Sequence, residues 1–157
     1  MDAMSGCLEK TGAIETADVG KILDFLRWFA DAHHQAKEET ILFPAMESAA
    51  GSQSRSVKHM ALEHTQERVL IEKMEKDLRL AHIAEFVKCA NWVSSTLRNH
   101  IYKEDRILFA EADAVLSPDQ DEVAFELLSR FETAEDKRIL EGKIQEMRAL
   151  EWKYLGR

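Results

Sequence analysis

Two segments of this chain pair a histidine with a glutamate four residues later, and the same three apolar residues follow each pair. The first segment reads His34-Gln-Ala-Lys-Glu38-Glu-Thr-Ile-Leu-Phe, and the second reads His100-Ile-Tyr-Lys-Glu104-Asp-Arg-Ile-Leu-Phe. On an α-helix, a separation of four residues puts both side chains on one face. An imidazole beside a carboxylate is typical of a metal-ligand pair. Two such pairs in one helical bundle would surround a shared interior point.

The acid of the second pair falls within an apolar stripe. At 100° per residue, the helix expected over 84–115 places Leu97, His100, Glu104 and Leu108 on one face. A carboxylate in that position is costly unless it is paired or bound to a metal. The stripe therefore indicates that Glu104 has a partner in the interior.

Three expected helices direct candidate ligands to the same interior. In the first helix the histidine of the motif faces inward and the glutamate lies at the edge of that face, and a helix over 55–80 adds one more inward histidine. The candidates are His34, Glu38, His64, His100 and Glu104. Two carboxylates and three imidazoles form a metal-ligand set of intermediate hardness. A buried structural ion pair would more often use Lys or Arg, so the pattern favours a metal site.

Other titratable residues near the motifs have less specific interpretations. His33 is the alternative to His34, but the spacing of four residues to the glutamate favours His34. His59 and His82 are expected at the surface or at helix ends. Glu67 would be either a partner of a neighbouring ligand or an ordinary exposed acid, and the exposed acid is the favoured interpretation.

The composition favours an all-α protein with one core. The chain has 157 residues, of which 45% are hydrophobic and 32% charged, and it contains only six Gly and two Pro. Helices are expected from a cap at Thr16 or Asp18 to about residue 50, over 55–80, over 84–115 and over 119–154. The loop at 51–54 places Ser54 as a helix cap, and Ser117-Pro118 starts the last helical stretch.

The charge and the cysteines bear on partners and compartment. The net charge of −8 disfavours binding to nucleic acid or to an anionic membrane. Cys7 and Cys89 form no C-x-x-C motif and no disulfide framework, which suits a reducing cytosol. No signal sequence and no run of about 18 apolar residues is present. We therefore expect a cytoplasmic protein without nucleic-acid or membrane partners.

These motifs resemble the hemerythrin-like, or HHE cation-binding, domain family. The resemblance rests on His34-x-x-x-Glu38-Glu-x-Ile-Leu-Phe-Pro, on Glu63-His64 with Arg68 beyond it, and on His100-Ile-x-Lys-Glu104-Asp-x-Ile-Leu-Phe. It covers most of residues 20–135, with three motifs in the right order. The resemblance implies an up-down antiparallel four-helix bundle.

The same resemblance implies a non-haem iron centre. Two irons would be bridged by Glu38 and Glu104 and capped by the imidazoles of His34, His64 and His100. Single-site occupancy and another divalent metal remain alternatives. An open iron position between apolar helices would favour a small diatomic ligand such as O₂ or NO.

The chain departs from the family pattern at its N-terminal end. Such domains usually carry another histidine on the first helix, but none precedes His33. Within a single domain over 1–157, residues 1–15 are therefore expected as the remnant of a shortened first helix. Residues 17–115 would form the metal-binding helices, and 119–157 a C-terminal helical extension. Either this extension or a homodimer would fill the groove beside the short helix.

Three functions fit these observations. The first is a di-iron module that binds or senses O₂ or NO, or handles iron, without turnover. The second is an enzyme that consumes peroxide or repairs iron centres with the same site. The third is a helical interaction protein with a vestigial metal site. We favour the first and predict no catalytic residue, because no acid/base pair, nucleophile motif or phosphate loop is visible.

Overall fold

The computed structural model describes residues 15–50 and 54–156, and within these ranges it contains helices and no strand. The expected first-helix remnant lies almost wholly outside the described residues, as does the loop at 51–53. The chain belongs to the all-α class, as its composition and periodicity predict.

The first long helix, here called the first rod, changes its winding along its length. It runs through α2 (Thr16–Phe25), two π-helical stretches η1 (Leu26–Gln35) and η2 (Glu38–Leu42), and α3 (Phe43–Ala50). The second rod is α4 (Arg55–Arg79). The third rod joins α5 (Ile83–Lys103), the π-helical η3 (Glu104–Leu108) and α6 (Phe109–Val115). The chain ends with α7 (Pro118–Phe131) and α8 (Ala134–Leu155).

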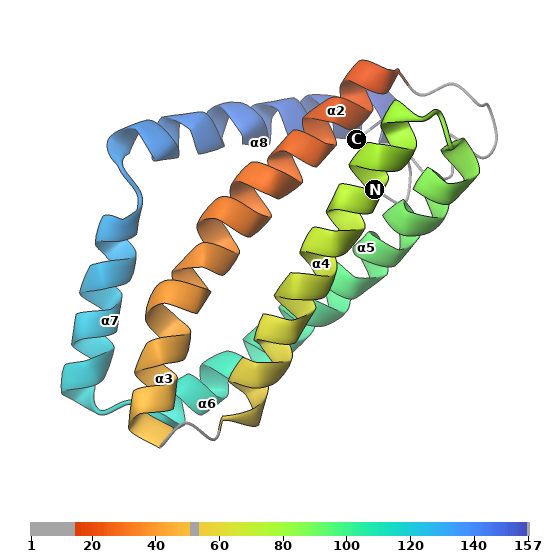
Figure 1. The fold of residues 1–157 in the computed structure, drawn as a ribbon. Coiled ribbons are helices and arrows are strands. Elements are labelled where there is room, and N and C mark those ends of the chain that lie inside the picture. The colour runs from red at the N-terminus through yellow and green to blue at the C-terminus, as the bar shows by residue number, and fades with distance from the viewer. Residues whose placement is uncertain (1–14, 51–53, 157) are drawn as a thin grey trace.

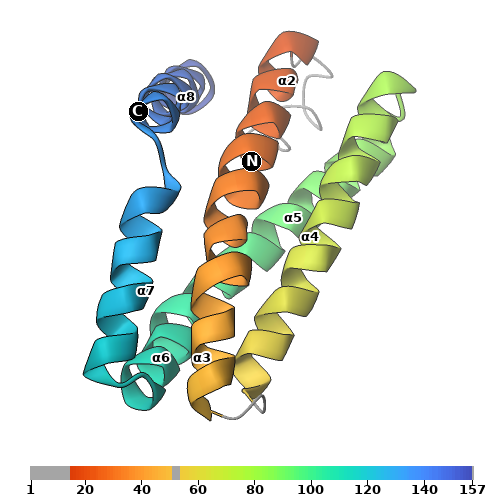
Figure 2. The same ribbon diagram turned by 60° about the vertical axis from the view of Figure 1, so that its left-hand side comes forward.

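The rods lie side by side, and the C-terminal helices cover one flank. In Figure 1 the second and third rods lie to one side of the first rod, and α7 and α8 lie to its other side. The turned view in Figure 2 agrees. Contacts of α8 with α2 and of α7 with η2 hold this arrangement. The C-terminal segment therefore packs on the first rod, and a homodimer stays a prediction.

Side-chain caps explain where α4, α7 and α8 begin. The Ser54 hydroxyl accepts a hydrogen bond from the Val57 backbone N–H at 3.2 Å, so the expected cap of α4 is confirmed. Ser117 likewise caps α7, which begins at Pro118. The stretch expected to be helical over 119–154 is helical, and it is divided into two helices because Thr133 forms a capping box that starts α8.

The cap expected for the first rod, Thr16 or Asp18, is wrong. Glu15 is the N-cap residue of α2, and its side chain makes no capping hydrogen bond. The buried Asp18 carboxylate instead accepts hydrogen bonds from Lys153 Nζ at 2.7 Å and Tyr154 Oη at 2.8 Å. Both donors come from α8, so Asp18 joins two distant parts of the chain.

Two apolar clusters pack the rods on either side of a polar layer. One cluster includes Leu23 and Leu26 of the first rod, and the other includes Phe43 and Met46 of the same rod. Along all the rods, the residues between the two clusters include the predicted ligands. The apolar clusters therefore border the polar layer along the bundle axis. None of the described helices is long and apolar enough to cross a membrane.

Candidate metal centre

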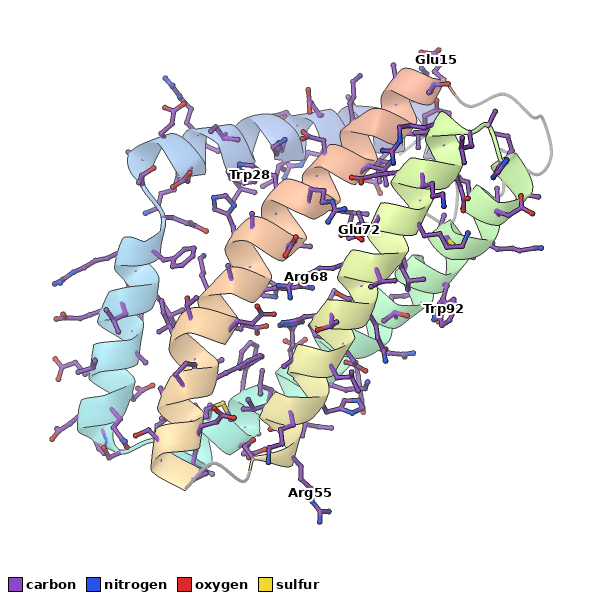
Figure 3. The ribbon with its side chains drawn as sticks, viewed as in Figure 1. Glu15, Trp28, Arg55, Arg68, Glu72 and Trp92 are labelled. Carbon is purple, nitrogen blue, oxygen red and sulfur yellow. The ribbon has the colours of Figure 1, made fainter. Side chains whose placement is uncertain are left out.

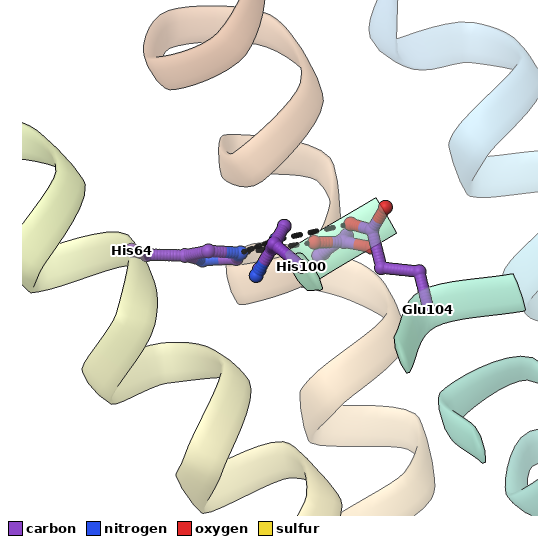
Figure 4. A group of neighbouring side chains, drawn as sticks. His64, His100 and Glu104 are labelled. Carbon is purple, nitrogen blue, oxygen red and sulfur yellow. Dashed lines mark hydrogen bonds and ion pairs between the residues drawn. The ribbon is translucent and has the colours of Figure 1, made fainter. Parts of the chain in front are cut away.

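Four of the five predicted ligands meet in the polar layer. Glu38 of the first rod, His64 of the second, and His100 and Glu104 of the third each offer one ligand atom, and these atoms lie within 4.8 Å of one another. We call these four residues the ligand cluster. All four are buried, and His64 is fully inaccessible to solvent. Figure 4 shows His64 pointing from α4 toward His100 and Glu104.

The imidazole nitrogens of the cluster point at one another. His64 Nε2 lies 3.2 Å from His100 Nε2. Each of these atoms also lies 3.2 Å from a carboxylate oxygen, His64 Nε2 from Glu38 Oε2 and His100 Nε2 from Glu104 Oε1. Two imidazole nitrogens and two carboxylates thus converge on one small volume, a donor combination that suits a transition-metal ion.

The fifth predicted ligand, His34, lies at the edge of this group. Its Nε2 is 3.1 Å from Glu104 Oε1, and its side chain is 38% exposed. The structure thus brings His34 next to one member of the cluster and leaves it in reach of solvent. The ligand role of all five residues stays a prediction.

Carboxylates on the far side of each buried imidazole hold its orientation. His64 Nδ1 lies 2.8 Å from Glu39 Oε1, and the same oxygen is 2.9 Å from Arg68. Figure 3 shows Arg68 between α4 and the first rod. His100 Nδ1 lies 3.0 Å from Glu63 Oε2, and Lys103 pairs with Glu63 in turn. Such carboxylates set the tautomer of a metal-bound histidine and direct Nε2 to the metal.

Both motif glutamates begin a π-helical stretch. Glu38 is the first residue of η2, and Glu104 is the first residue of η3. The Ile-Leu segment after each motif continues the same stretch. Single π turns within α-helices are frequent at functional sites, because the wider turn changes the direction of side chains. The repeated sequence therefore has a repeated local structure.

The charges of the cluster stabilise one another. Burial alone lowers the pKa of His100, but hydrogen bonds to Glu104 and Glu63 outweigh it and raise the pKa to about 9. Burial alone raises the pKa of Glu104, yet hydrogen bonds from His100 and His34 bring it well below its usual range. The hydrogen bond to Glu104 also raises the pKa of His34. The two imidazoles and the Glu104 carboxylate thus favour one another's charged forms.

The chemistry of the ligand cluster fits a bound cation. Both side-chain oxygens of Glu38 are buried, and among the described residues neither has a hydrogen-bond partner. The approach of Glu38 Oε2 to His64 lacks hydrogen-bond geometry. A buried carboxylate without donors is strongly unfavourable, and a bound metal ion would satisfy it.

Sequence reasoning missed two buried residues beside the cluster. Glu67 is 1% exposed, so its interpretation as an exposed acid is wrong. Its carboxylate accepts a hydrogen bond from Gln35 Nε2 at 2.6 Å, and burial raises its pKa. The sequence spacing could have indicated that both residues face the interior. Glu67 follows His64 by three residues and Gln35 precedes Glu38 by three, so each shares a helix face with a predicted ligand.

The remaining histidines lie elsewhere. His33, the alternative to His34, donates from Nδ1 to the Trp28 carbonyl at 2.7 Å and stacks on the Trp28 ring. Its Nε2 lies 3.4 Å from Asp136 of α8. Trp28 is labelled on the α8 side of the first rod in Figure 3. His59 and His82 are exposed, as expected. His33 therefore belongs to the packing of α8.

Comparison with known proteins agrees with this geometry. The family model described as the hemerythrin HHE cation binding domain matches residues 1–112. This range includes every residue of the ligand cluster and His34. No curated protein and no solved structure gives a significant match. With a buried His/Glu cluster between helical rods and a family match over most of its length, the chain belongs to the hemerythrin HHE cation-binding family.

Proposed function

We propose that this protein binds non-haem iron, as a di-iron centre, and uses it to bind or sense a small diatomic ligand such as O₂ or NO. The observation that carries the proposal is the convergence of Glu38, His64, His100 and Glu104 within 4.8 Å. His34 would add an imidazole at the edge. Carboxylates and imidazoles together suit iron better than Ca²⁺ or Mg²⁺, which take oxygen ligands.

Burial supports a small ligand. Every member of the ligand cluster is buried, and apolar side chains pack on both sides of the polar layer. A bulky organic substrate would have to displace this packing, whereas a diatomic molecule would not. The partly exposed His34 marks the edge through which such a ligand would enter.

The chain's own residues would provide position and charge. Bound iron would supply an open coordination position for the small ligand. Glu39 and Glu63 hold the Nδ1 side of the two buried imidazoles, so Nε2 of each faces the interior. The glutamates of the cluster would offset the charge of the cations. Imidazoles bind metals only when they are deprotonated at the ligating nitrogen, so iron retention should fall in acid.

Anaerobic reconstitution with Fe²⁺ tests the proposal. We expect at least one iron per chain, a spectral change on addition of NO, and no sustained consumption of O₂ or peroxide. His100→Ala should lose most of the iron, because it removes a predicted buried ligand and one of the two imidazoles that pair with Glu104. Lys88→Ala, an exposed change on the same helix α5, should bind iron like the wild type.

Two results would contradict the proposal in different ways. Steady consumption of peroxide or O₂ would indicate an enzyme that uses the same site. Less than one iron per chain, with no effect of His100→Ala, would favour a vestigial site in a helical interaction protein.

A further inference from the structure

Four buried oxygen atoms of the polar layer have no hydrogen-bond partner within the described part of the chain. They are Gln35 Oε1, Glu38 Oε1, Glu38 Oε2 and Glu67 Oε1. All four are acceptors. Among the described residues, every buried side-chain donor has a partner. The polar layer therefore has an excess of acceptors, which a positively charged group would balance.

These oxygens belong to two adjacent levels between the first rod and α4. At one level, Glu38 Oε2 lies 3.2 Å from His64 Nε2. At the other level, Gln35 Nε2 donates to Glu67 Oε2 at 2.6 Å. Gln35 precedes Glu38 by three residues and Glu67 follows His64 by three, so the two levels are about one helical turn apart on the same faces.

The Gln35–Glu67 level is well enclosed. Gln35 is 2% exposed and Glu67 is 1% exposed. The amide group of Gln35 contributes its donor to Glu67 and leaves its own oxygen unpartnered. Two oxygens from two helices thus remain available in a buried volume beside the ligand cluster.

We infer that Gln35 and Glu67, together with the shared carboxylate of Glu38, form a second cation position ligated by oxygen atoms. This inference rests on the proposed function, because it assigns further ligands to the same metal centre. The first position is the ligand cluster, in which His64 and His100 supply nitrogen. The second position draws on a side-chain amide oxygen and two carboxylates.

The two positions therefore differ in the metals that suit them. Imidazole nitrogens favour iron, zinc and similar transition metals, whereas an all-oxygen set is harder and accepts Mn²⁺ or Mg²⁺ as readily. The centre is then asymmetric, with a nitrogen-containing position on the side of the third rod and an oxygen position between the first rod and α4.

The competing explanation is a neutral pair. A protonated Glu67 could donate to the Gln35 amide and would need no cation. Both explanations account for the hydrogen bond between the two side chains. They differ in what a change at Glu67 does to metal binding.

Equilibrium dialysis of the full chain against Mn²⁺, and against Fe²⁺ without oxygen, separates the two explanations. We expect the wild type to bind two cations per chain. Glu67→Gln keeps the size of the side chain and the contact with Gln35, and should weaken binding of the second cation at least tenfold. The matched control Glu72→Gln changes an exposed acid on the same helix and should bind like the wild type.

The outcomes of this experiment are distinct. If Glu67→Gln keeps the stoichiometry and affinity of the wild type, the inference is overturned and the proposed function is untouched. A wild type that binds one cation, with no effect of Glu67→Gln, overturns it as well. If the wild type itself binds less than one cation, both the inference and the proposed function fail.

A second variant keeps the inference testable should Glu67→Gln not fold. Gln35→Glu places another carboxylate against Glu67. The melting temperature of the metal-free variant should fall below that of the wild type, and Mn²⁺ should raise it by more than it raises the wild type. An equal or smaller effect of Mn²⁺ on the variant would contradict an oxygen-ligated cation position.

Discussion

At the scale of single residues, each buried imidazole of the candidate centre has two different neighbours. Nε2 of His64 faces the ligand cluster, while its Nδ1 lies 2.8 Å from Glu39. His100 repeats this arrangement with Glu63. Contacts within the chain thus orient both rings, which would lower the cost of assembling a metal site.

Glu39→Gln tests the contribution of this orientation. The variant removes the negative charge beside His64 Nδ1 and weakens the contact with Arg68, while leaving all predicted ligands in place. We expect Fe²⁺ affinity to fall by about 10- to 100-fold without loss of a binding position. Titration with Fe²⁺ under anaerobic conditions measures both quantities. An unchanged affinity, equal to that of the Glu72→Gln control, would show that Glu39 does not support His64.

Part of this site could be predicted from the sequence and part could not. The spacing of His34 to Glu38 and of His100 to Glu104 is local, so helical geometry alone brings each pair to one face. The contact of Glu39 with His64 joins residues 25 positions apart. Such contacts depend on how the rods are rotated against each other. The burial of Glu67 was not predicted, because α4 carries many charged residues and a spacing of three from His64 distinguishes Glu67 only weakly from the exposed ones.

At the scale of helices, side-chain caps mark the starts of α4, α7 and α8. Ser54 and Ser117 were predictable because their hydroxyls accept backbone hydrogen bonds at helix starts. The π-helical stretches at Glu38 and Glu104 were not, because no residue type marks a widened turn. The start of the first rod was misassigned because Asp18 is used in tertiary packing instead of capping.

The contact between α2 and α8 depends on Asp18. Hydrogen bonds from Lys153 and Tyr154 lower the Asp18 pKa to about 2. The charged form is thus stabilised in the folded state, and this stability is present above the ordinary pKa near 4 and lost as the pH falls toward 2. Asp18→Asn should therefore lower the free energy of unfolding by about 1 to 2 kcal/mol at pH 7.

Chemical denaturation at several pH values measures this effect. The difference between the wild type and Asp18→Asn should narrow as the pH falls from 4 toward 2. Asp113→Asn, an exposed change on α6, should alter stability little at any pH. A difference that stays constant across this pH range would refute the role of the charged carboxylate.

At the scale of the whole molecule, the fold places a polar layer between two apolar clusters. This layering carries a cost, because buried carboxylates and imidazoles replace apolar packing in the middle of the bundle. An all-α bundle followed from composition and periodicity. The placement of α7 and α8 on the flank of the first rod was only one of two alternatives, because periodicity indicates an apolar face on a helix but not which neighbour covers it. A metal ion bound in the polar layer would offset this cost, because it would pair with the buried carboxylates.

The most direct test is anomalous diffraction at the iron absorption edge from crystals grown with Fe²⁺. Our account predicts an anomalous peak enclosed by Glu38, His64, His100 and Glu104. The absence of a peak at this position, in crystals that show iron only at the surface, would contradict the claim that the buried cluster is a metal centre.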